Sequence, residues 1–72
     1  MAPKLSPLNS SSLEACGHDP DANELHVKFR NGGGYVFHGI SADQHQAMMD
    51  APSKGRHLAM FIKPVAEKVS KL

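Results

Sequence analysis

Alternating apolar and polar side chains mark the central part of the chain. Apolar residues occupy every second position over residues 24–30, a period of two that is typical of a half-buried strand. Residues 11–17 and 35–40 predict further strands on either side of it. The intervening segments 19–23 and 31–34 are rich in Asp, Asn, Pro and Gly, which favour tight turns. The pattern therefore predicts a three-stranded antiparallel meander.

The glycine-rich turn leaves two registers open for this hairpin. A turn of two or four residues would place Tyr35 and Phe37 on the basic face, beside Lys28. A turn of three or five residues would place them with Val27 and Phe29, because a shift of one residue reverses every side chain. The first register predicts an exposed platform for stacking nucleic-acid bases. The second predicts an aromatic core, which we favour because the chain has only four aromatic residues to bury.

Helical signals follow the strands. Ser41 and Gln44 match a capping box at the start of a helix over residues 41–50, and Pro52 interrupts the pattern. A second helix is predicted from residue 53 or 54, and Pro64 should end or kink it.

The expected fold class is α+β, with a three-stranded antiparallel β-meander followed by two short helices packed on one face. Residues 1–10 are predicted to form a flexible N-terminal arm, residues 11–63 the domain, and residues 64–72 a basic C-terminal tail or helix extension. The predicted core consists of the large apolar residues Leu13, Leu25, Val27, Phe29, Tyr35, Phe37, Met48, Leu58, Phe61 and Ile62.

Length and composition allow one small domain. A chain of 72 residues buries only about 60% of the surface that its unfolded form exposes, which leaves little room for a deep active site. The single cysteine, the absence of a long apolar run and the absence of a signal-peptide pattern predict a cytoplasmic protein without a membrane partner.

The charge is unevenly distributed although its net value is only +1. Residues 13–53 hold two basic residues and six acidic ones, whereas residues 54–72 hold five basic residues and one glutamate. This asymmetry predicts electrostatic recognition at the C-terminal end. We expect the partner to contact the side chains of Lys54, Arg56, His57, Lys63, Lys68 and Lys71.

A possible anion site lies at the start of the second helix. Ser53, Lys54, Gly55 and Arg56 combine a hydroxyl group, free backbone amides and two cations, and helix N-termini favour anions. The alternative is a tight turn between helices that needs Pro52 and Gly55 and is basic by coincidence.

Catalytic and metal chemistry lack a complete set of residues. His26 and His38 could meet across the hairpin, with Cys16 or His18 nearby, but the sequence contains no paired-cysteine motif and no two histidines four apart on a helix. Cys16 has no evident base or oxyanion donor. We therefore predict no metal, no cofactor, no small-molecule substrate and no enzymatic activity.

The order of motifs resembles the KTSC domain, a family named for an extension at the C-terminus of some lysyl-tRNA synthetases. The resemblance rests on Ser11-Ser12, Leu25-x-Val27-x-Phe29, the glycine turn, Tyr35-Val36-Phe37 and the segment 51–55, and it covers residues 11–63. The family has a central Tyr-x-Tyr, whose second tyrosine is Phe37 in this chain. The resemblance implies a β-meander followed by helices, a proposed RNA-binding role and no catalytic residues.

The chain as a whole also resembles phage-encoded KTSC-like proteins that bind bacterial RNA polymerase. That resemblance implies a protein partner, a subunit of RNA polymerase, and a role in inhibiting or modifying transcription. RNA is the alternative partner. We favour the protein partner because phosphate neutralisation dominates nucleic-acid affinity and a net charge of +1 is low for that purpose.

Overall fold

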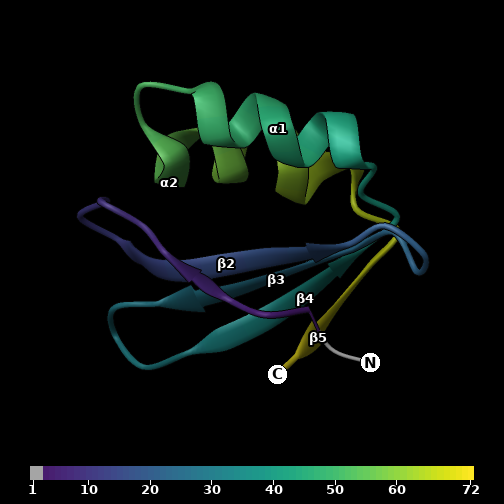
Figure 1. The fold of residues 1–72 in the computed structure, drawn as a ribbon, viewed down its shortest axis with the longest axis horizontal. Coiled ribbons are helices and arrows are strands. Elements are labelled where there is room, and N and C mark those ends of the chain that lie inside the picture. The colour runs from purple at the N-terminus through teal and green to yellow at the C-terminus, as the bar shows by residue number, and fades with distance from the viewer. Residues whose placement is uncertain (1–2) are drawn as a thin grey trace.

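Five strands form a single antiparallel sheet, with the helices packed on one of its faces (Figure 1). The computed structural model describes residues 3–72. The strands lie in the sheet in the order of the sequence, as β1 (Ser6–Pro7), β2 (Leu13–Asp19), β3 (Glu24–Phe29), β4 (Gly34–His38) and β5 (Lys68–Lys71). The prediction of an α+β fold with an antiparallel sheet is confirmed, but the prediction of three strands is wrong.

The two additional strands lie at the edges of the sheet. Ser6 and Pro7 pair with β2, and Leu8 is buried, so this part of the predicted arm is held against the domain. A strand of two residues is too short to show an alternation of apolar and polar side chains in the sequence. Pro7 is tolerated in β1 because β1 is an edge strand, where the missing N–H group costs no ladder hydrogen bond. Met1 and Ala2, which the arm was also predicted to include, lie outside the described residues.

Residues 64–72, predicted as a basic tail or helix extension, instead contain β5, which pairs with β4. Val65, Val69 and Leu72 have helical spacing in the sequence, but backbone pairing with the free edge of β4 decides the conformation of this segment. Tyr35 lies opposite Lys71, and Phe37 lies opposite Val69.

The helical layer begins with α1 (Ala42–Asp50), which starts at the predicted capping box. The Ser41 hydroxyl accepts a hydrogen bond from the Gln44 amide at 3.2 Å, and the Gln44 side chain accepts one from the Ser41 amide at 2.7 Å. The chain then continues through α2 (Lys54–His57), the π-helical turn η1 (Leu58–Ile62) and the 3₁₀ turn η2 (Lys63–Val65), which contains Pro64.

The core lies between the sheet and the helices. It includes the predicted Leu13, Leu25, Val27, Phe37, Met48, Leu58 and Ile62, together with Leu8, Cys16 and Ile40, which were not predicted. Phe29 and Tyr35 are partly buried against this cluster. Phe61 was predicted in the core but is 57% exposed, whereas the adjacent Ile62 is 1% exposed.

The opposite, outer face of the sheet carries polar side chains. His26 lies on it and is nevertheless buried, beside Val36 on the neighbouring strand. The segment before β1 crosses this face at Gly17, where an added Cβ would lie 2.5 Å from the carbonyl oxygen of Lys4. In the part of the chain that the structure describes, no helix is long and apolar enough to cross a membrane.

Candidate partner-binding site

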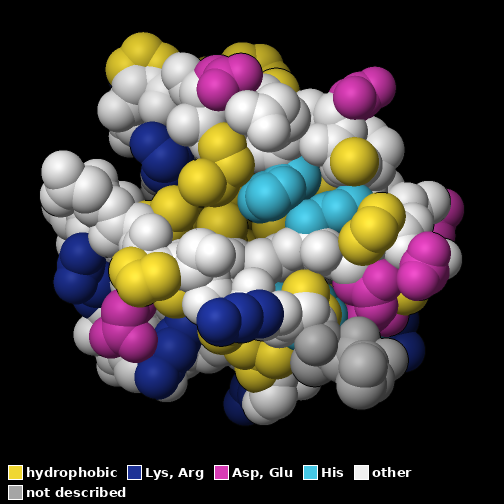
Figure 2. Space-filling view, in the orientation of Figure 1, with side chains coloured by type: hydrophobic (Ala, Val, Ile, Leu, Met, Phe, Trp, Pro, Cys, Tyr) yellow, Lys and Arg dark blue, Asp and Glu magenta, His cyan; other side chains and the backbone are white. Residues whose placement is uncertain are grey.

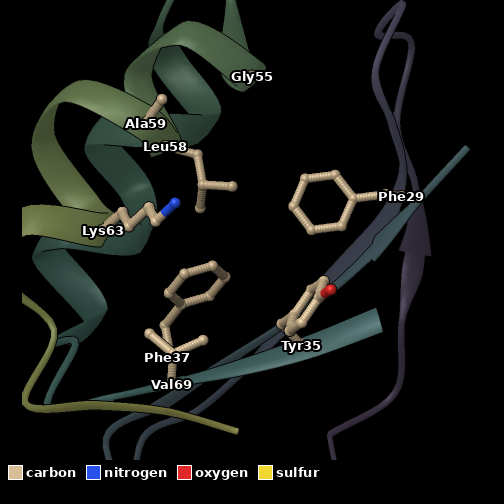
Figure 3. Close-up of a pocket in the computed structure, with 8 residues that line it drawn as sticks. All are labelled: Phe29, Tyr35, Phe37, Gly55, Leu58, Ala59, Lys63 and Val69. Carbon is tan, nitrogen blue, oxygen red and sulfur yellow. The ribbon is translucent and has the colours of Figure 1, made fainter. Parts of the chain in front are cut away.

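An apolar cavity of about 380 Å³ opens between the sheet and the C-terminal helical turns. We refer to it as the aromatic pocket, and its lining residues are Phe29, Tyr35, Phe37, Gly55, Leu58, Ala59, Lys63 and Val69. Figure 3 shows the three rings and the Lys63 side chain directed into the space between η1 and the sheet. A cavity of this size with few polar groups is typical of ligand or side-chain binding sites.

The hairpin register creates the aromatic wall of this pocket. Val27 lies opposite Tyr35, and Leu25 lies opposite Phe37. Residues directly opposite on neighbouring strands share a face, so both aromatic residues point toward the helices. The predicted core register is therefore confirmed. Phe29 and Tyr35 meet edge to face, with ring centroids 5.7 Å apart and an interplanar angle of 71°.

The predicted lysines divide between the two faces of the sheet. Lys63 lines the aromatic pocket, and Lys71 lies opposite Tyr35 and so projects from the same face. Lys68 lies opposite His38 and projects from the outer face. Only two of the three lysines are therefore placed to contact a partner that occupies the pocket.

The remaining predicted contact residues belong to α2. Arg56 and His57 line a shallow hollow with Met60 and Phe61, on a different side of the helical turns from the aromatic pocket. The Arg56 Nε–H donates to the Met60 sulfur at 3.3 Å, and the His57 ring lies 4.8 Å from the Phe61 ring. The six predicted contact residues therefore do not form one continuous basic surface.

The four residues of the predicted anion site line different hollows. Ser53 and Lys54 line a small polar hollow of about 140 Å³, Arg56 lines the hollow beside Phe61, and Gly55 lines the aromatic pocket. The Ser53 hydroxyl accepts the Arg56 backbone N–H at 3.4 Å and so caps α2. Gly55 packs against the Ser12 hydroxyl so closely that a Cβ there would collide with it.

The histidines that the sequence suggested could meet are joined on the outer face. Glu24 bridges them, with one carboxylate oxygen 3.1 Å from His26 Nε2 and the other 3.3 Å from His38 Nδ1. His38 Nε2 lies 3.1 Å from the Ser70 hydroxyl oxygen. Cys16 lies opposite Val27 in the β2–β3 ladder, which places its side chain on the helix-facing side of the sheet. The grouping of Cys16 with His26 and His38 is therefore not formed.

Cys16 has other neighbours that the sequence analysis did not identify. Its sulfur lies 3.8 Å from His45 Nε2 and 3.7 Å from the Met49 sulfur, both on α1. Burial raises the pKa of the Cys16 thiol, and the charge of Lys54 opposes this change. Burial lowers the pKa of His45, and the neighbouring His18 lowers it further.

Comparison with known proteins identifies the family. The model of the KTSC domain matches residues 9–65, most of the chain. The chain belongs to the KTSC domain family. A KTSC domain protein from Yersinia pestis, known from a crystal structure, is 35% identical and superposes with a TM-score of 0.91 over 99% of each chain.

Two further relatives support the family assignment. A protein of Stutzerimonas stutzeri strain A1501 is 39% identical over 57 residues, which cover 79% of this chain and 80% of the relative. A protein of Tsukamurella paurometabola is 30% identical over 60 residues, which cover 83% of this chain and 90% of the relative. The names of these relatives state no binding partner.

The central aromatic motif of the KTSC domain lies in the aromatic pocket. The resemblance places the family's Tyr-x-Tyr at Tyr35 and Phe37, and both line the cavity. Phe37 is 3% exposed, and its ring lacks the hydroxyl group that the second tyrosine of the motif would carry. The Tyr35 ring is only partly buried and remains available to a bound group.

Proposed function

We propose that this KTSC domain is a non-catalytic module that binds a protein partner at the aromatic pocket. The observation that carries the proposal is the apolar cavity with Lys63 on its wall and Lys71 projecting from the same face of the sheet. Such a site fits an apolar side chain that enters the cavity and acidic side chains that meet the two lysines. Interfaces commonly depend on one buried anchor of this kind.

The geometry favours a protein over RNA as the partner. Bases stack on aromatic rings that lie flat and open to solvent. Here Phe29 and Tyr35 meet edge to face, and the helical turns cover part of the sheet that carries them. The pocket is therefore a cavity that suits an inserted side chain, and it lacks the open aromatic surface that a run of stacked bases needs.

A subunit of bacterial RNA polymerase is the first partner that we propose to test, and its choice rests on the sequence resemblance alone. Binding would then inhibit or modify transcription. RNA is the second candidate, because a proposed RNA-binding role comes with the family resemblance.

Equilibrium titration of the labelled full-length chain distinguishes these partners. RNA polymerase and an unstructured RNA would each be titrated at two salt concentrations. Binding of RNA through phosphates should weaken by roughly 0.7 log units per log unit of salt for each contact, whereas rim charges at a protein interface mainly change the association rate. Tight, strongly salt-sensitive binding to RNA without binding to the polymerase would refute the proposal.

Two lysines on β5 provide a matched pair of variants. Lys71→Gln removes a charge beside the aromatic pocket, and Lys68→Gln removes a charge from the same strand on the outer face. We expect Lys71→Gln to slow association with the polymerase and Lys68→Gln to leave it unchanged. Equal effects of the two substitutions would indicate a nonspecific attraction and would count against the pocket.

A further inference from the structure

Three donor atoms lie beneath α1, away from the aromatic pocket, with the Cys16 sulfur close to each of the other two. They are the thiol sulfur of Cys16 on β2 and, on α1, the Nε2 atom of His45 and the thioether sulfur of Met49. The Cys16 sulfur lies 3.8 Å from the nitrogen and 3.7 Å from the second sulfur. The proposed function uses none of these three groups.

Local structure explains why these side chains meet. His45 and Met49 are four residues apart on α1, and this spacing places two side chains one above the other on the same helix face. Cys16 and His18 are two residues apart on β2 and share the helix-facing side of the sheet. The His18 ring stacks on the His45 ring at 5.4 Å with an interplanar angle of 10°. His18 Nε2–H also donates to the carbonyl oxygen of Ile40 at 2.6 Å, which fixes the stacked ring.

The two separations that include the Cys16 sulfur are close to those of ligands that share one metal ion. Metal–sulfur and metal–nitrogen bonds of about 2.3 and 2.0 Å, at angles between tetrahedral and trigonal, place sulfur and nitrogen about 3.5–3.7 Å apart. The same geometry places two sulfur atoms about 3.8–4.0 Å apart. The observed separations of 3.8 and 3.7 Å lie close to these ranges, so the two pairs that include Cys16 require little movement when an ion enters.

The chemistry of the donors selects the ion. Thiolate and thioether ligands favour soft ions such as Cu⁺, whereas zinc sites take cysteine, histidine and carboxylate ligands. Among residues 3–72, no three His, Cys, Asp or Glu side chains are grouped so that they could hold a metal ion. The third donor of this cluster is a thioether, which zinc sites do not use. We propose that Cys16, His45 and Met49 form a binding site for one Cu⁺ ion.

The surroundings of the cluster are compatible with uptake of an ion. Cys16 is 2% exposed, whereas His45 and Met49 are half-buried and border the surface. Figure 2 shows histidine and apolar side chains at the surface between the helical layer and the sheet. Binding replaces the S–H bond of Cys16 with an S–Cu bond and releases one proton to solvent, with no change in oxidation state.

Competition for Cu⁺ tests the site directly. The reduced full-length protein is titrated without oxygen against the Cu⁺ complex of the coloured chelator bathocuproine disulfonate. We expect the protein to remove one Cu⁺ per chain and to gain an ultraviolet thiolate-to-copper absorption. X-ray absorption at the copper edge should show two sulfur ligands and one nitrogen ligand. Failure to remove Cu⁺, or one-to-one binding of Zn²⁺ in its place, would overturn the proposal.

Substitutions separate this site from adventitious binding. Cys16→Ser should abolish Cu⁺ binding. Met49→Leu and His45→Gln should each weaken the affinity for Cu⁺ by more than about tenfold, because even the loss of an outer-shell partner costs about 10–100-fold in metal affinity. Met49→Leu conserves volume and should leave the fold intact, which circular dichroism would verify. Met60→Leu and His57→Gln, away from the cluster, should bind like the wild type. Equal affinity of the Met49→Leu and Met60→Leu variants would refute the assignment of Met49 as a ligand.

Discussion

Phe61 and Ile62 are adjacent in sequence but should contribute very differently to stability. Ile62 is 1% exposed and lies in the core, so Ile62→Ala removes three carbon atoms from a closely packed interior. Such substitutions cost about 2–5 kcal/mol through lost transfer free energy and the remaining cavity. Phe61 is 57% exposed and contacts the His57 ring. Because less than half of its surface is buried, Phe61→Ala should cost about 1 kcal/mol or less.

The difference is large on the scale of the whole domain. A chain of 72 residues has a total stability of roughly 4–11 kcal/mol, at about 0.05–0.15 kcal/mol per residue. Urea denaturation at 25 °C, followed by far-ultraviolet circular dichroism, gives the free energy of unfolding of both variants. The slope of that energy with urea should stay constant. If Phe61→Ala is as destabilising as Ile62→Ala, the orientation of η1 described here is wrong.

Three other substitutions test parts of the fold that lie away from η1. Gly17→Ala places a Cβ 2.5 Å from the Lys4 carbonyl oxygen and should release the segment that contains β1. Amide hydrogen exchange should then rise at residues 5–8 and not in β3. An unchanged exchange pattern would contradict the passage of this segment over Gly17. Ser41→Ala removes one half of the capping box and should cost about 0.5–2 kcal/mol in the same urea assay, with Ser53→Ala as a comparison at the shorter helix. Asn23 has a φ of 52°, which glycine adopts more easily than alanine. Asn23→Ala should therefore destabilise the domain by about 1 kcal/mol, whereas Asn23→Gly should be tolerated. The opposite ranking would argue against this backbone conformation.

Local signals predicted the elements that depend on neighbouring residues. The alternation of apolar and polar residues around Val27 predicted β3, and the capping box formed by Ser41 and Gln44 predicted the start of α1. The prediction that Phe61 lies in the core was wrong because it assumed α-helical spacing. The turn η1 is π-helical, with hydrogen bonds between residues five apart, so a helical wheel of 3.6 residues per turn assigns its buried face incorrectly.

The candidate sites depend on contacts between distant segments, which local patterns do not specify. Lys71 projects from the face of the sheet that carries the aromatic pocket only because β5 pairs with β4, and the spacing of Val65, Val69 and Leu72 resembled a helix instead. From the sequence, Cys16 could lie near His26 and His38, and no metal site was predicted there. His45 and Met49 are four apart on a predicted helix and so share one face, but no local pattern brings Cys16 to that face.

Filling the aromatic pocket is the most direct test of the proposed function. Ala59 is exposed and lines the cavity, so Ala59→Leu adds three carbon atoms inside it with little expected cost to folding. The affinity of this variant for RNA polymerase would be measured beside that of the wild type and of Ala47→Leu, an exposed position on α1. Loss of a buried anchor of about 2 kcal/mol predicts roughly 30-fold weaker binding for Ala59→Leu alone. Equal affinity of all three proteins for the polymerase would contradict binding through the pocket.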